Sequence, residues 1–151
     1  EVNIYGIEAE LERSLGNQNF LFAHASYLRG ENEYDDEPLT EVPASELTLG
    51  FRHAADLGWN WNIAARIVDE QDRVGKRLTN GTEDPTSGFV TLDAGLGYRF
   101  GAGQRGNNHS INLTFTNLLD KKYHEHLTEG LSGWEPLAPG RSVHLRWDME
   151  F

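Results

Sequence analysis

Residues 141–151 read RSVHLRWDMEF, and this stretch decides the fold. The apolar positions are Val143, Leu145, Trp147, Met149 and Phe151. The positions between them are polar or charged: Ser142, His144, Arg146, Asp148 and Glu150. Because successive side chains of a strand point to opposite faces, this segment predicts a strand with one apolar and one polar face. Such a strand suits a wall that has lipid outside and water inside.

The same alternation recurs toward the N-terminus, and no segment has a comparable helical period. The further alternating segments are 7–12, 20–28, 46–52, 59–68, 90–100 and 111–116. The pattern is weakest in 20–28. Together with the last segment they predict an all-β chain of about seven antiparallel strands.

The connections between these segments alternate in length. Short turns are expected at 16–18, 54–58 and 101–107, and long polar loops at 29–44, 69–87 and 118–140. Transmembrane barrels combine short periplasmic turns with long extracellular loops, so the pattern predicts an up-and-down transmembrane β-barrel. Aromatic residues next to the short turns predict a girdle at the membrane interface. They are Phe51, Trp59, Trp61, Tyr98, Phe100 and Phe151.

Composition excludes several other classes of protein. The mean hydropathy is negative, and no apolar run approaches the ~20 residues that a membrane-spanning helix needs. The net charge of −11 argues against nucleic acid as a partner, because phosphate binding requires clustered Lys and Arg. Seven is an odd number, whereas bacterial single-chain barrels generally have an even number of strands. The count and the start at Glu1 therefore predict an incomplete wall, with at least one strand before it.

The sequence does not predict an enzyme. No nucleophile, base and orienting group occur at a plausible spacing. The glycines at 101, 103 and 106 match the spacing of a dinucleotide-binding loop, but that chemistry needs a following helix. The next segment alternates as a strand does, so we expect a glycine-rich turn and no cofactor.

The C-terminal third resembles the end of TonB-dependent outer-membrane receptors. The resemblance rests on Asn117-Leu118-Leu119-Asp120-Lys121-Lys122-Tyr123, on His124-Glu125-His126-Leu127, on Pro139-Gly140-Arg141 and on a last strand that ends in Phe151. Weaker matches upstream are Gly6-Ile7-Glu8, Pro38-Leu39 and Val42-Pro43, so it covers essentially the whole chain. It implies a 22-stranded barrel with a plug domain inside. Residues 1–151 would be the C-terminal part of this barrel, without the plug and the N-terminal strands.

The resemblance also implies a function in the bacterial outer membrane. We expect TonB-dependent uptake of a metal chelate, with a ferric siderophore as the default and haem, copper, zinc or cobalamin as other options. The implied partners are the lipid bilayer, lipopolysaccharide, the plug domain and upstream strands, the TonB complex and the chelate. One alternative is a small self-contained outer-membrane barrel with a structural or adhesive role. A second is a soluble ligand-binding barrel or sandwich with an apolar interior.

Several motif residues are expected to have structural roles. Asn117 interrupts the alternation, and Leu118 and Leu119 are consecutive apolar residues, which predicts a bulge or a strand exit. Pro139 and Gly140 are expected to mark the start of the last strand, with Gly140 in a conformation unavailable to other residues. The other residues assigned to the motif are Asp120, Tyr123 and Arg141. In the family, a terminal aromatic such as Phe151 is part of the assembly signal; alternatively it only packs against lipid.

Two histidines are the candidates for metal or ligand binding. His124 and His126 flank Glu125 and would share one face of a strand, where they could bind copper, zinc or haem iron. The alternative, which we favour, is a polar loop base, because no third ligand is identifiable. The outer loop at 31–41 is acidic and is expected to be a solvated surface or to be bridged to lipopolysaccharide by divalent ions. Other charged side chains are expected to face the barrel lumen and the plug: Arg66, Asp93, Arg99, Arg146, Asp148 and Glu150.

Overall fold

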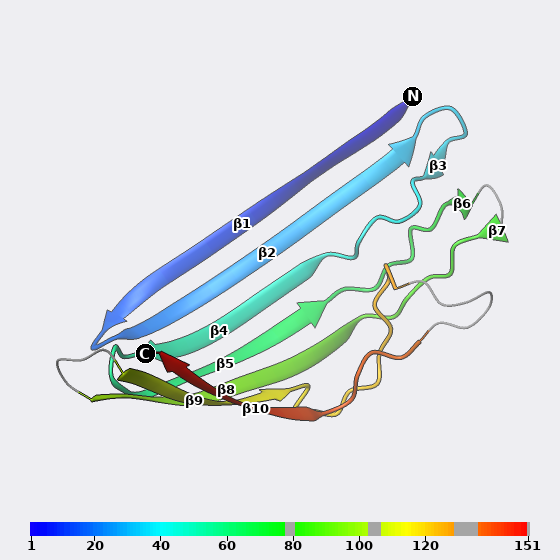
Figure 1. Cartoon of the computed structure of the whole chain (residues 1–151). Helices are drawn as coiled ribbons and strands as arrows, with labels where there is room; N and C mark the ends of the chain where they lie inside the picture. The colour runs from blue at the N-terminus through cyan, green and yellow to red at the C-terminus, as the bar shows by residue number, and fades with distance from the viewer. Residues whose placement is uncertain (78–80, 103–106, 129–135, 151) are drawn as a thin grey trace.

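The computed structural model describes residues 1–77, 81–102, 107–128 and 136–150, and in these ranges the chain contains strands and no helix. Seven long strands form one antiparallel sheet in chain order (Figure 1). They are β1 (Val2–Gly16), β2 (Asn19–Asn32), β4 (Glu46–Ala54), β5 (Gly58–Val68), β8 (Phe89–Ala102), β9 (Asn107–Thr116) and β10 (Ser142–Glu150). The all-β prediction and its seven strands are confirmed. No helix in this part of the chain is long and apolar enough to cross a membrane.

Three two-residue strands lie in the long connections and were not predicted. β3 (Glu37–Pro38) pairs with the end of β2, while β6 (Lys76–Arg77) pairs with β7 (Gly81–Thr82) in a separate hairpin. Two residues are too few to show an alternating pattern.

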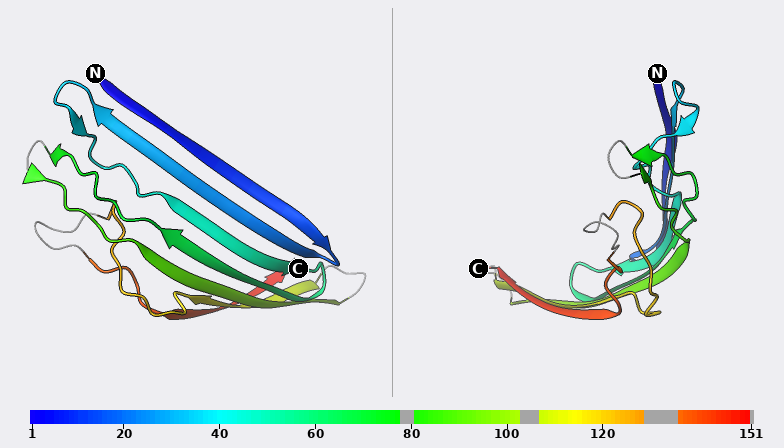
Figure 2. Two further views of the ribbon diagram at one scale, coloured as in Figure 1. Left: turned by 180° about the vertical axis from the view of Figure 1, so that it is seen from behind. Right: turned by 90° about the vertical axis from the view of Figure 1, so that its right-hand side faces the viewer.

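The long strands form an open, curved wall. Its edges are β1 and β10, which lie at opposite ends of the strand order. The right-hand view of Figure 2 shows the curvature and places the connection between β9 and β10 on the concave side. The first two short turns are at the predicted positions: Gly16 and Gly58 have φ angles of +84° and +90°, which glycine adopts without steric cost. Of the third predicted turn, 101–107, residues 101–102 end β8 and residue 107 begins β9, while 103–106 lie outside the described residues.

The strand register puts the apolar side chains on one face. Trp147 is paired with Ile111, Ile111 with Tyr98, and Tyr98 with Trp59, and directly paired residues share a face. These side chains are exposed, Trp147 by 64% and Trp59 by 58%. Among the described residues no large side chain is fully buried. A soluble barrel or sandwich would enclose this apolar face, so that alternative does not fit the structure.

Aromatic rings gather next to the short turns, as predicted. Ring centroids are 5.1 Å apart for Phe51 and Trp61, and 4.8 Å apart for Trp59 and Tyr98. The row continues through Phe100 and adds residues that the prediction did not include: His53, His109 and Trp147. Phe151 lies outside the described residues.

Two neighbouring alanines test which face meets lipid. Ala65 of β5 is in the apolar register, paired with Leu49 and Leu92, whereas Ala64 is paired with Asp93 on the polar face. We expect Ala65→Arg to lower the free energy of unfolding by about 2–4 kcal/mol, because the charge enters the hydrocarbon. Ala64→Arg serves as the control. It should lower the free energy of unfolding much less, because its guanidinium would lie on the polar face next to Asp93. Urea unfolding of the complete protein in lipid vesicles measures both; equal losses would contradict this assignment of faces.

Candidate functional site

The long connections lie together at one end of the sheet, and one of them folds inward. The connection between β9 and β10 starts at Asn117 and runs over the concave, polar face of the wall (Figure 2). The side chains of Tyr123, Glu125 and His126 contact the wall or another connection. The side chain of Asn117 joins the two ends of the connection itself, and these four residues define the candidate site.

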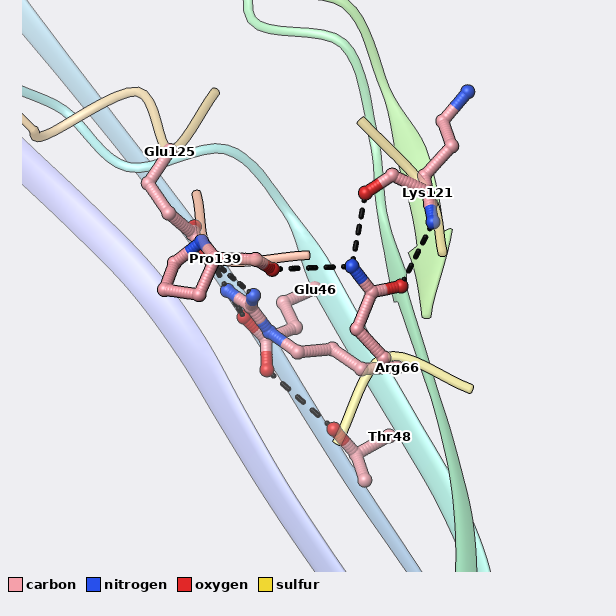
Figure 3. A network of polar contacts seen from close by, with 7 residues as sticks. Glu46, Thr48, Arg66, Lys121, Glu125 and Pro139 are labelled. Carbon is pink, nitrogen blue, oxygen red and sulfur yellow. Dashed lines mark hydrogen bonds and ion pairs between the residues drawn. The ribbon is translucent and has the colours of Figure 1, made fainter. Parts of the chain in front are cut away.

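Arg66 of β5 fixes the middle of this connection to the wall (Figure 3). Its guanidinium forms a bidentate ion pair with Glu125, in which Nη2 lies 3.1 Å from Oε2 and Nη1 donates to Oε1. The same Nη2 donates to Glu46 Oε2 of β4 over 2.8 Å. The guanidinium also lies 5.2 Å from the centre of the Phe89 ring. Because the Arg66 side chain is only 30% exposed, these contacts are partly shielded from solvent.

Asn117 fixes both ends of the connection. Its φ of +50° ends β9, and its backbone N–H donates to Asp93 Oδ1 over 2.8 Å. The Asn117 amide donates to the carbonyl oxygens of Lys121 and Pro139 over 2.9 and 3.2 Å, and accepts the Lys121 N–H over 2.9 Å. Asn117 is 4% exposed. One buried side chain thus joins the first turn of the connection to its last residues.

Tyr123 packs the connection against β8. Its ring stacks on Phe89 with centroids 4.0 Å apart, and its carbonyl oxygen accepts the Ala138 N–H over 2.9 Å. Burial, together with the nearby Glu125 carboxylate, raises the pKa of the Tyr123 phenol.

The other motif residues surround this corner. The Leu118 N–H donates to the Leu92 carbonyl over 2.7 Å, and the Arg141 N–H donates to Asp120 Oδ1 over 3.0 Å. Gly140 does not have the special conformation predicted for it, because its φ is not in the positive region. It lies close to Asp120 instead: a Cβ atom at Gly140 would be 3.1 Å from Asp120 Oδ1. A side chain at this position would therefore crowd the Asp120 carboxylate.

The two histidines have different surroundings. His126 is buried, with Nδ1 3.0 Å from Thr86 Oγ1 and Nε2 3.4 Å from Glu83 Oε1. His124 is half-buried, and Glu125 binds Arg66. No group of three or more His, Cys, Asp and Glu that could hold a metal ion occurs among the described residues. The metal assignment therefore stays a prediction.

Four of the predicted lumen-facing charges, Asp93, Arg99, Arg146 and Asp148, share the face of Arg66. Arg146 pairs with Asp148 at 2.6 Å, and Arg99 Nη1 donates to the Asp56 carbonyl over 3.4 Å. The structure does not describe the side chain of Glu150.

Sequence reasoning missed Glu46, Glu83, Thr86 and Phe89 as site residues. Of these, only Glu46 had a usable signal, a carboxylate on the polar face at the start of a strand.

Comparisons with known proteins agree with this architecture. The profile of a family described as "TonB dependent receptor-like, beta-barrel" matches residues 1–118. Among solved structures, one described as "Copper transporter OprC" superimposes with a TM-score of 0.81 over 99% of this chain, at 24% sequence identity. The chain spans 24% of that protein's length, and the likeness shows the fold. No curated protein matches the sequence.

Proposed function

This chain belongs to the TonB-dependent receptor β-barrel family, and on this premise we propose that it is part of the wall of a transporter that imports a metal chelate. The family lies in the bacterial outer membrane and consists of transporters rather than enzymes, in agreement with the sequence analysis. In the proposed arrangement, residues 1–151 supply the C-terminal part of the barrel. The plug domain and the remaining strands belong to the rest of the receptor.

The observation that supports the proposal is the inward-folded connection between β9 and β10. The Arg66–Glu125 ion pair holds it on the concave face, which is polar and faces the lumen in a closed barrel. A connection held there narrows the outer mouth of the lumen, so a solute entering from outside meets it first. This arrangement suits selective capture better than a purely adhesive role, for which the loops would project outward.

Two cargo classes follow from different observations. A ferric siderophore is the default that the family resemblance implies. Copper is the second candidate, because the structural neighbour is described as a copper transporter. The proposed partners are the chelate, the TonB complex, lipopolysaccharide and the surrounding bilayer.

Uptake by the complete receptor tests the function and separates the two cargo classes. We expect cells that express it to accumulate ⁵⁵Fe from ferric siderophores, and to lose this uptake when tonB is deleted. Copper accumulation that depends on TonB would favour the second candidate. The matched control is a strain without the receptor. Siderophore, haem, copper, zinc and cobalamin uptake that all equal this control would exclude the transport proposal.

A further inference from the structure

Glu83 and His126 form a buried contact at which three connections meet. Glu83 lies between β7 and β8, and His126 between β9 and β10. Their side chains are 3% and 4% exposed, and His126 Nε2 is 3.4 Å from Glu83 Oε1. The third connection, between β2 and β4, contributes the backbone N–H of Glu41. It donates to the two Glu83 carboxylate oxygens over 3.2 and 3.3 Å.

Further hydrogen bonds hold this contact in place. His126 Nδ1 lies 3.0 Å from Thr86 Oγ1, so both ring nitrogens face residues of the connection before β8. Gln71, which is 7% exposed, donates to the Val42 carbonyl over 2.9 Å and exchanges two backbone hydrogen bonds with Thr86. Polar groups buried to this degree are costly to leave without partners. The contact therefore depends on all three connections being in place.

The backbone at Glu41 points to the same conclusion. Its φ is +61°, a left-handed conformation that costs energy for a residue with a side chain. The N–H of this residue is the one that binds Glu83. The Glu83 carboxylate thus stabilises a strained peptide in a connection about 40 residues away in sequence.

We propose that Glu83 and His126 form a latch that couples the three outer connections, so that they loosen and close together. The Glu83 carboxylate accepts the Glu41 N–H, and the His126 ring, which shares a hydrogen bond with Thr86 through Nδ1, lies against the same carboxylate. Removing either side chain takes away a neighbour from polar groups that are buried on the other connections, so we expect a change in one connection to loosen the other two. A solute that displaces one connection then acts on the other two. The latch involves the loops alone and does not depend on which cargo is carried.

Hydrogen exchange of the complete receptor in lipid tests the latch. We expect Glu83→Gln and His126→Leu each to speed amide exchange about tenfold in segments 38–43, 71–75 and 121–128. In the His126→Leu variant, the decisive result is the amide exchange rate of segment 38–43. His126 would affect this segment through Glu83, which binds the Glu41 N–H. Asp84→Asn is the matched control, because it removes an exposed carboxylate next to Glu83 and should leave all three segments unchanged.

Two results would overturn the proposal. One is faster exchange in His126→Leu that stays confined to 121–128, which would show that the connections move independently. The other is an Asp84→Asn variant that loosens the segments as much as Glu83→Gln does. If Glu83→Gln and His126→Leu do not assemble, Thr86→Val removes only the hydroxyl next to His126 Nδ1 and keeps the shape of the side chain. It should give a smaller increase in the same three segments, and an increase confined to the segment around Thr86 would again overturn the latch.

Discussion

Asn117→Ala is expected to lower the free energy of unfolding of the complete receptor by about 3 kcal/mol. The side chain is 4% exposed and makes three hydrogen bonds with the backbone of Lys121 and Pro139. Truncation leaves these backbone groups without their partner in a buried corner, and unmade buried hydrogen bonds are costly. Alanine also tolerates the φ of +50° less well than asparagine does.

A glycine at the same position separates the two causes. Asn117→Gly loses the same hydrogen bonds but adopts a positive φ without steric cost, so it should be about 1 kcal/mol less harmful than Asn117→Ala. Urea unfolding in lipid vesicles measures both variants. Asn112→Ala provides a control for the loss of an amide on the preceding strand, β9, where Asn112 bonds to Ser110 and Asp148 instead. An Asn117→Ala receptor as stable as the wild type would rule out this role for the corner.

Arg66→Gln is also expected to destabilise the complete receptor, because it removes the cation between two carboxylates. Glu46 and Glu125 then face each other without a counter-charge, and the inward-folded connection loses its ion pair with the wall. The three side chains are 26–35% exposed, so solvent weakens the interaction below that of a fully buried pair. We expect a loss of about 1–2 kcal/mol in the free energy of unfolding. Faster hydrogen exchange in 121–128 should accompany it.

A double variant isolates the ion pair. Glu125→Gln in the Arg66→Gln background removes one of the two repelling carboxylates, so it should recover part of the lost stability. Arg99→Gln is the matched control, because Arg99 lies on the same face and donates to a backbone carbonyl at the other end of the wall. If Arg66→Gln and Arg99→Gln have equal effects on 121–128, Arg66 does not anchor the connection.

The wall could be predicted strand by strand, because alternation is a local property. For Trp147 and Trp59, the alternation of the neighbouring residues indicates on which face of the sheet the side chain lies. Strand pairing in register then places directly paired residues on the same face. The turns at Gly16 and Gly58 were predictable for the same reason. The prediction for Gly140 was wrong because glycine serves two needs, conformational freedom and space. Sequence alone does not distinguish them.

The sequence by itself determined the two faces of the wall, the alternation of short and long connections and the family. Each of these depends on residues next to one another or on a motif read in order. Only the tertiary structure decided that Arg66 binds Glu125, 59 residues away, and that Glu83 binds the Glu41 N–H, 42 residues away. Charged residues in polar connections carry no periodic signal, and many pairings are compatible with the same composition. The fold selects among them by bringing particular connections onto the concave face, where burial makes an unpaired polar group costly.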